Sequence, residues 1–513
     1  MSKPGLPLMR SSRVGHPLGR VVLLAAILIG LAGASAEAAE WKFTLRFAEQ
    51  LQAEPFTGRV YLFFSRNAQP GPRFGPDWFH PEPFVSLHVS NWRPGEVLTI
   101  DPATPELHSF PRPLGELNLA NAYVQAVVRL NPYEPDVGTG AGNGFSQVHP
   151  LGAGPGEKPL SLLVDQQVPA RRFRESQWAK LLEVRSDMLS KFHERDVIQR
   201  GAVLLPASYY AQPERRYPVL FVVPGFGGDH FMGQRDQPLD EQNAQGVEFI
   251  RVYLDPKCPR GHHVFADSAN NGPFGTALVK EFIPELDRRF RTVPAATARF
   301  LTGHSSGGWS TLWLQITYPE TFGGTWSTAP DPVDFRDFQQ INIYRPGENM
   351  YRDAEGQLRP LARRGDQVIV RYRDFADMEW TLGHGGQLHS FEAVFSPRDE
   401  EGKPRLLWNR ANGEIDPEVA RAWEAYDIRL VLERNWETLG PKLRGKLHVL
   451  MGDQDTFYLE GATRLLKEAL EKLGSDAEIE LVPGRDHFNL LSPDRVMQMR
   501  SQMVQAFLEH HRP

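Results

Sequence analysis

The residues from Arg299 to Trp309 read R-F-L-T-G-H-S-S-G-G-W, a short apolar run followed by a cluster of small residues. Within this stretch, residues 303–307 fit the pattern G-x-S-x-G. That pattern is typical of a nucleophile elbow, in which a serine occupies a sharp turn between a buried strand and a helix, and small neighbours relieve the crowding. It makes Ser305 the candidate nucleophile. Because the same letters also describe an ordinary Gly/Ser turn, the surrounding sequence has to decide between the two interpretations.

Apolar runs and helical patterns alternate on both sides of this serine. Continuous apolar runs with β-branched residues are typical of strands buried on both faces of a parallel sheet. They occur at residues 218–223, 247–254, 299–301, 446–451 and 478–482. Helical patterns lie between or after them at residues 277–290, 308–317, 459–473 and 496–508. This alternation predicts βαβ units and an α/β domain over residues 200–513.

The alternation stops between residues 331 and 445. This segment is rich in Arg, Asp, Gly and Trp and has only local helical signal, as at residues 418–433. We expect an insertion over the carboxyl ends of the strands, which is either a lid or a structural elaboration away from any site.

The 513 residues exceed one typical domain, and the part before residue 200 has a different pattern. Short alternating runs separated by Pro, Gly and Asn predict an all-β sandwich at residues 40–165. Its aromatic segment Phe74–Phe84 is interpreted as a proline-braced loop whose rings fill the sandwich core, with a sugar-binding surface as the alternative. Residues 166–199 are charged and helix-permissive, and we expect them to connect the two domains.

Residues 1–36 have the layout of a secretory signal peptide. Basic residues precede an apolar run at residues 21–31, and the cleavage-site pattern Ala34-Ser35-Ala36 follows; the basic residues are Lys3, Arg10, Arg13 and Arg20. A membrane anchor is the alternative, but the apolar run is much shorter than the roughly 20 residues that span a bilayer. We therefore expect a periplasmic or secreted protein.

Charge and cysteine content restrict the partners. Removal of the leader would change the formal net charge from −6 to −10, which disfavours a nucleic acid partner or an anionic membrane. Cys258 is the only cysteine, so no disulfide forms within the chain and no cysteine-type zinc site exists. The histidines follow no metal-ligand spacing, so we expect no metal.

Further candidate site residues follow the predicted strands. Residues 224–228, P-G-F-G-G, come directly after the run 218–223. This segment, the glycine loop, suits close approach of backbone N–H groups to an oxyanion, and the predicted donors are the N–H groups of Phe226 and Ser306. His487 follows the run 478–482, and an aspartate follows the run 446–451, so both are expected at the edge of the sheet that carries ligands.

Three aspartates are candidates for the acid that orients His487. Asp331 follows a strand around Trp326, whereas Asp453 and Asp455 follow the run 446–451. Asp453 comes directly after a glycine and is expected to belong to the turn, where Asp commonly binds its own backbone. The order Ser, Asp, His that is expected of α/β-hydrolases does not exclude Asp331, but Asp331 lies between Pro330 and Pro332, where the chain is expected to turn. We predict Asp455, which lies two residues beyond the turn and is better placed to reach the ring of His487.

With these residues in place, the chain resembles the α/β-hydrolase fold and, within it, the putative esterase family that includes esterase D, enterochelin esterases, feruloyl esterases and mycolyltransferases. The resemblance covers roughly residue 200 to the C-terminus. It rests on P-G-F-G-G, on F-A-D-S-A-N-N-G-P-F-G (Phe265 to Gly275), on G-H-S-S-G-G and on G-R-D-H-F. It implies hydrolysis of carboxylic esters through an acyl-serine intermediate, with no cofactor and no metal, and it implies the spacing G-x-x-D that ends at Asp455.

The chemistry of a Ser-His-Asp triad gives the same expectation. A serine hydroxyl is a weak nucleophile at neutral pH, so His487 would take its proton while Asp455 orients the imidazole and two N–H groups bind the oxyanion. The expected partner is a small-molecule or polymer-linked ester. The same triad would also serve an acyltransferase or a serine peptidase. A further alternative is an inert hydrolase domain carrying a β-sandwich binding module.

Overall fold

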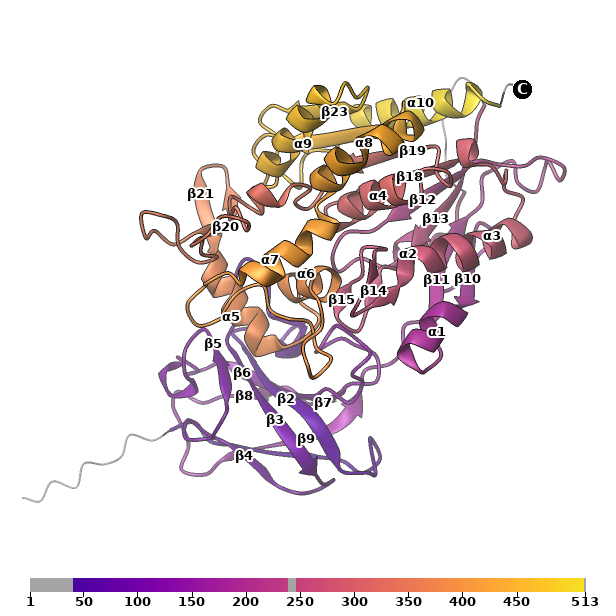
Figure 1. Ribbon diagram of the computed structural model, residues 1–513. Helices are drawn as coiled ribbons and strands as arrows, with labels where there is room; N and C mark the ends of the chain where they lie inside the picture. Colours follow the sequence, from indigo (N-terminus) through magenta and orange to yellow (C-terminus); the bar gives the residue numbers. More distant parts are fainter. Residues whose placement is uncertain (1–39, 239–245, 512–513) are drawn as a thin grey trace, which may run out of the picture. The chain divides into compact units, whose positions relative to one another are not determined.

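Two large sheets organise the chain in the computed structural model, which describes residues 40–238 and 246–511 (Figure 1). The predicted leader at residues 1–36 lies outside the described residues. One sheet of nine strands belongs to the N-terminal region and ends at Gln167, two residues beyond the predicted boundary at residue 165, and one sheet of eight strands begins at Ala179. The described residues form one compact unit.

The eight-stranded sheet has the order β10-β11-β13-β12-β18-β19-β22-β23. Its strands are β10 (Ala179–Arg185), β11 (Ile198–Leu204), β12 (Val219–Val223), β13 (Ile250–Leu254), β18 (Arg299–His304), β19 (Gly324–Thr328), β22 (Leu447–Gly452) and β23 (Glu478–Val482). From β13 to β23 all neighbours are parallel, whereas β10 and β11 are antiparallel additions at one edge. The apolar runs in the sequence therefore correspond to buried parallel strands, as expected.

Helices cover both faces of this sheet (Figure 1). On one face Phe221 and Leu301 pack against apolar side chains of α3 (Ile283–Arg289) and α4 (Ser306–Thr317). On the other face Leu220 and Phe300 pack against α10 (Pro493–Leu508). Alternate side chains of the central strands thus enter different cores, whereas the edge strand β23 keeps Glu478 and Glu480 exposed. The expected α/β architecture is confirmed.

The strands of the N-terminal region form one curled sheet that encloses its own core. Its order is β4-β1-β9-β7-β6-β2-β3-β5, with β8 paired to β6. The strands are β1 (Phe43–Phe47), β2 (Phe56–Ser65), β3 (Phe84–Trp92), β4 (Leu98–Ile100), β5 (His108–Phe110), β6 (Tyr123–Val128), β7 (Gly144–Ser146), β8 (His149–Pro150) and β9 (Leu160–Gln167). Alternate residues of these strands, such as Phe43, Leu62 and Val124, share one hydrophobic core. The predicted all-β region is therefore present.

The opposite face of this sheet is also apolar. Tyr61, Phe63 and Phe84 belong to the same buried cluster as Phe375 and Phe391 of the insertion. Hydrogen bonds join the two parts as well, since Tyr61 Oη donates to the Leu382 carbonyl at 2.8 Å. A strand that is buried on both faces has a continuous apolar sequence, as β2 has at residues 60–64. The insertion therefore packs on the N-terminal sheet.

The insertion contains helices and one small hairpin. Its elements are β20 (Pro360–Arg364), β21 (Gln367–Arg371), α5 (Tyr372–Leu382), α6 (Gln387–Phe395), α7 (Pro417–Trp423) and α8 (Ile428–Leu443). α5 lies against β3 and β5 of the N-terminal sheet, and α8 lies against α4 and α9 (Glu460–Lys472) of the α/β part.

Part of the expected connector is regular structure. Within residues 166–199, β10 pairs with β11 and α1 (Asp187–His193) joins them, so the eight-stranded sheet begins before residue 200. The charged residues suggested a helix, but on an edge hairpin Arg and Glu pair across the strands, as Arg200 Nε and Glu183 do at 2.9 Å. Within the described residues, no helix is long and apolar enough to cross a membrane.

Candidate active site

Ser305 occupies a sharp turn between β18 and α4. Its backbone has φ 59° and ψ −126°, an unusual conformation for a residue with a side chain, and its N–H donates to the Thr328 carbonyl at 3.0 Å. Two glycines make the turn possible: a Cβ on Gly303 would lie 2.2 Å from the Gly307 carbonyl oxygen, and a Cβ on Gly307 would lie 2.0 Å from the Val223 carbonyl oxygen. The sequence pattern therefore marks a nucleophile elbow in the structure rather than an ordinary turn.

The structure brings His487 and Asp455 together. His487 Nδ1 lies 2.8 Å from Asp455 Oδ2, and both side chains are almost completely buried. Asp455 Oδ1 accepts a hydrogen bond from the Phe457 N–H at 2.8 Å, so both carboxylate oxygens are fixed. Burial lowers the pKa of His487, but the carboxylates of Asp455, Asp331 and Asp486 outweigh burial and raise this pKa above its usual value of 6.5.

The glycine loop passes directly beside Ser305. A Cβ on Gly225 would lie 3.3 Å from the Ser305 Cβ and 3.0 Å from the His304 carbonyl oxygen. The Gly228 N–H donates to the Gly225 carbonyl at 3.0 Å, so Phe226 and Gly227 are the central residues of a tight turn. Ser306 is the first residue of α4, where backbone N–H groups have no acceptor within the helix. Both predicted donors therefore lie next to the elbow.

Asp331 has a different position from the one expected for a competing acid. Its Oδ2 accepts a hydrogen bond from Ser306 Oγ at 2.5 Å and another from Gln387 Nε2 at 3.2 Å. Its Oδ1 lies 3.5 Å from Ser305 Oγ. Burial raises the pKa of Asp331 to about 6. The third candidate, Asp453, accepts from the Gly484 N–H at 2.7 Å and thereby joins the two loops after β22 and β23.

Ser305 and His487 line a cavity of about 720 Å³, the Ser305 cavity. Three parts of the chain contribute its walls: the α/β part, the segment before β3 and the insertion. Aromatic rings predominate among the side chains; they are Phe74, Trp78, Phe79, Phe226, Phe375, Phe391, Phe457 and Phe488. A mostly apolar cavity with a few convergent polar groups is the usual form of a small-molecule site.

The interpretation of the segment Phe74–Phe84 as core was wrong for three of its rings, Phe74, Trp78 and Phe79, of which Phe74 is exposed. The Trp78 ring centroid lies 5.3 Å from that of Phe226 and 5.1 Å from that of Phe375, and Phe79 stacks on Phe457 at 6.0 Å. Only Phe84, at the start of β3, is a buried core residue. Glu82 fixes the end of the segment on β2, since it accepts a hydrogen bond from Ser65 Oγ at 2.5 Å. The three prolines and two acidic residues between the rings were the available signal that these rings are not core.

Gln387 was not predicted as a site residue. It lies at the start of α6 in the insertion, and its Nε2 donates to Ser306 Oγ at 3.1 Å as well as to Asp331. Nothing in the local sequence marks it, because its role depends on how the insertion packs.

Comparison with known proteins agrees with this geometry. The sequence profile of the family described as "putative esterase" matches residues 198–488, which is more than half of the chain and includes Ser305, Asp455 and His487. The chain belongs to this family. The esterase is thus a serine hydrolase that acts on carboxylic esters, on an α/β-hydrolase fold.

Several solved structures are similar to the esterase. A ferulic acid esterase is 13% identical, with 64% of this chain and 99% of that chain covered and a TM-score of 0.39. The fluorophosphonate-binding serine hydrolase F of Staphylococcus aureus is 12% identical, with 64% and 99% covered and a TM-score of 0.39. An S-formylglutathione hydrolase from Agrobacterium tumefaciens is 14% identical, with 64% and 94% covered and a TM-score of 0.36. The family assignment rests on the sequence match.

Proposed function

We propose that this esterase is an exported enzyme that cleaves carboxylic esters through an acyl-serine intermediate, with Ser305 as nucleophile, His487 as general base and Asp455 as the orienting acid. The observation that carries the proposal is the convergence of three features in one cavity: an elbow serine, a buried His-Asp pair and a glycine loop. A nucleophile, a base held by a third group and nearby N–H donors are the parts that acyl transfer requires.

A residue of the chain carries out each step of the proposed ester hydrolysis. The Asp455 carboxylate accepts from His487 Nδ1, so Nε2 is unprotonated and takes the Ser305 hydroxyl proton as Ser305 Oγ attacks the ester carbonyl. The N–H groups of Phe226 and Ser306 bind the oxyanion of the tetrahedral intermediate. His487 then returns the proton to the leaving alcohol. Water, activated by the same histidine, attacks the acyl-serine and releases the acid.

The Ser305 cavity favours an ester with at least one flat or apolar half. The aromatic side chains that line it offer stacking surfaces. Polar side chains lie around Ser305, Asp331 and Gln387 and also on the wall from the N-terminal region, at Asn67, Asp77, Glu82 and Asp136. The proposal that the enzyme is exported rests on residues 1–36, in which basic residues are followed by an apolar run and then by a cleavage-site pattern of small residues. A periplasmic or secreted enzyme would meet small-molecule or polymer-linked esters outside the cytoplasm.

The elbow offers a matched pair of variants that tests the nucleophile. Ser305→Ala should lower ester turnover by several orders of magnitude, because loss of a triad member has that effect. Ser306→Ala removes a hydroxyl that donates to Asp331 but keeps the N–H, so it should retain turnover within about tenfold. A panel of p-nitrophenyl, feruloyl, acetyl-sugar and siderophore-lactone esters supplies the substrates.

Labelling of the folded protein with a fluorophosphonate, followed by peptide mass spectrometry, gives an independent result. The label is expected on Ser305 and is expected to be lost in Ser305→Ala. Turnover by Ser305→Ala near that of the wild type, or a label on another serine, would contradict the proposal. Addition of an acceptor alcohol and of amide substrates separates hydrolysis from acyl transfer and from peptidase activity.

A further inference from the structure

A small hairpin contacts the glycine loop at both of its ends. The hairpin consists of β14 (Lys257–Cys258) and β15 (Gly261–His262), and Lys257 lies directly opposite His262 in its register. His262 Nε2 lies 3.0 Å from the carbonyl oxygen of Pro224, which begins the loop. Lys257 Nζ lies 3.6 Å from Oδ2 of Asp229, which follows the loop. One pair of opposite residues therefore reaches both sides of Phe226.

His262 is fixed as a hydrogen-bond donor. Its Nδ1 accepts from the Val264 N–H at 3.0 Å, so Nε2 carries the hydrogen and donates to the Pro224 carbonyl. The ring is buried, and burial lowers the pKa of His262 to about 4, so the imidazole stays neutral near pH 7. The carbonyl that it binds belongs to the peptide immediately before Gly225. The orientation of the loop's first peptide is thus set by this side chain.

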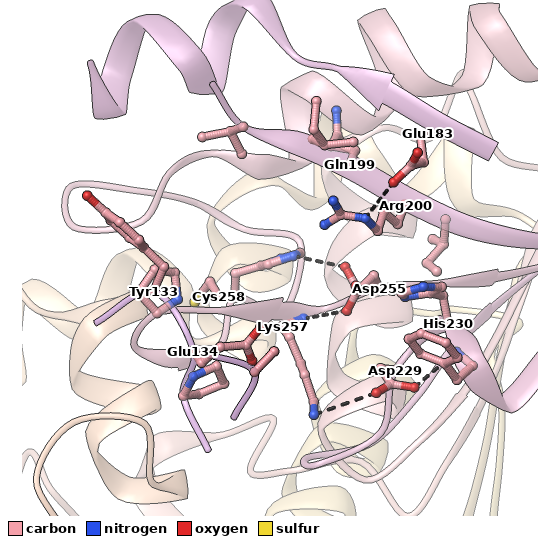
Figure 2. Close-up of a pocket in the computed structure, with 18 of the residues that line it drawn as sticks. Tyr133, Glu134, Glu183, Gln199, Arg200, Asp229, His230, Asp255, Lys257 and Cys258 are labelled. Atoms are coloured by element: carbon pink, nitrogen blue, oxygen red, sulfur yellow. Dashed lines mark hydrogen bonds and ion pairs between the residues drawn. The ribbon is translucent and has the colours of Figure 1, made fainter. Parts of the chain in front are cut away.

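Lys257 holds the other end through charge. Asp229 Oδ1 accepts from the Phe231 N–H at 3.0 Å, and its Oδ2 is paired with Arg171 at 2.6 Å. The same oxygen faces Lys257 (Figure 2). Lys257 Nζ also lies 2.8 Å from Oδ2 of Asp136. Burial lowers the pKa of Lys257, but the carboxylates of Asp136, Asp229 and Asp255 outweigh it and raise this pKa, so the ammonium stays charged.

Asp136 comes from the N-terminal region, between β6 and β7, so this contact joins the curled sheet to the glycine loop. Lys257 and Asp229 line a second cavity of about 840 Å³, the Lys257 cavity. Gly227 lines both this cavity and the Ser305 cavity, so the loop forms part of the wall of each. On this side the loop is held by these charged contacts and by the packing of Phe231, whose ring lies 5.9 Å from that of Phe173 and 3.8 Å from the Arg171 guanidinium carbon.

We propose that Lys257 and His262 are positioning residues for the Phe226 N–H, and that Asp136 makes the N-terminal region part of this support. The inference rests on the proposed function, in which Phe226 N–H binds the oxyanion. Donors of this kind act through their fixed position, and removal of one such donor lowers kcat by about 10²–10³. Without Lys257 the carboxylate of Asp229 stays paired with Arg171, so the loop is loosened at this end rather than freed and loses part of that factor.

Lys257→Met removes the charge at similar volume and is the main variant. We expect kcat for a small p-nitrophenyl ester to fall by about 10–100-fold, with KM changed less than about threefold, because the interaction that is lost forms only with the oxyanion. Asp136→Asn should lower kcat by a few-fold in the same pattern, and Lys257→Arg should keep most of it. Arg195→Met is the control, since Arg195 lines the same cavity but packs over Tyr133.

A second measurement works without any substrate. Amide hydrogen exchange in residues 225–231 should be faster in Lys257→Met than in the wild type, by a larger factor than in the rest of the chain, which distinguishes local loosening from a general loss of stability. Wild-type kcat together with wild-type exchange in this variant would overturn the inference. A 10–100-fold rise of KM with no loss of kcat would overturn it as well. If the wild-type protein hydrolysed no ester and took no fluorophosphonate label, the proposed function would fail, while the exchange comparison would still test the support of the loop.

Discussion

Replacement of Asp455 by Asn should abolish most turnover while leaving the fold intact. The reason lies in the two contacts of the carboxylate. The Phe457 N–H donates to Oδ1, so the asparagine must place its carbonyl oxygen there and its NH₂ group toward His487. An NH₂ group can only donate, and His487 Nδ1 must then accept. The ring is consequently held with its hydrogen on Nε2, where it cannot take a proton from Ser305.

The magnitude combines this wrong tautomer with the loss of the charge that stabilises the imidazolium. In a triad of this kind the change lowers kcat by about 10⁴, which corresponds to about 5.5 kcal/mol in the activation free energy. The assay is kcat for a p-nitrophenyl ester with purified protein whose Tm and circular dichroism are compared with the wild type. KM should change little, because the substrate does not contact Asp455.

Asp453→Asn is the matched control, since it lies two residues away and contacts the Gly484 N–H instead of the histidine. It should keep kcat within a few-fold. A folded Asp455→Asn protein with wild-type kcat would refute the reasoning, and loss of kcat in Asp331→Asn alone would assign the acid to Asp331.

Further expectations concern pH, stability, the cavity and processing. Since the pKa of His487 is raised above 6.5 and turnover needs the neutral ring, kcat/KM should fall as pH decreases through a value above 6.5. Asp331→Asn removes one of the carboxylates that raise this pKa, so the fall of kcat/KM should occur at lower pH in this variant. Because the folded-state pKa of Asp331 is raised to about 6 from 3.8, its ionisation destabilises the fold above that pH by on the order of 2–3 kcal/mol, so Asp331→Asn should have a higher Tm than the wild type at pH 7.5 and no gain at pH 4. Trp78→Ala should lower kcat/KM for a feruloyl ester by about tenfold, which corresponds to about 1.4 kcal/mol of lost stacking and burial, and should leave kcat/KM for an acetyl ester almost unchanged. Equal losses of kcat/KM for both esters would contradict a role of this ring in binding the acyl or alcohol group. N-terminal sequencing of exported protein should begin near Glu37 to Glu40, and a mature protein that starts at Met1 would contradict export by cleavage.

The α/β part was predictable because its signals are local. Apolar runs of β-branched residues are required wherever a strand is buried on both faces, and each of the five runs corresponds to a strand of the eight-stranded sheet. The edge hairpin of β10 and β11 was missed, since an exposed strand can carry Arg and Glu in a pattern that also suits a helix. Cross-strand partners, such as Arg200 for Glu183, are not visible before the pairing is known.

The positions of Ser305, Asp455 and His487 after predicted strands were sufficient to predict that they lie at one edge of the sheet, because parallel strands have their carboxyl ends at the same edge. The other walls of the Ser305 cavity were not predictable. Trp78 and Gln387 come from segments that are far apart in the chain from Ser305, and their position depends on how the N-terminal region and the insertion pack on each other. Hydrophobic periodicity indicates whether a residue is buried, but it does not indicate which other part of the chain packs against that residue.

The apolar outer face of the N-terminal sheet has a consequence for the modularity of this esterase. An accessory domain that joins a catalytic domain through a polar linker can be exchanged or deleted without exposing a core. Here Tyr61, Phe63 and Phe84 share a core with the insertion, so cutting the chain between the two parts would leave two aromatic surfaces open to water and prone to aggregation. Deletion of the N-terminal region alone should therefore expose the apolar side of the insertion and lower the solubility of the enzyme.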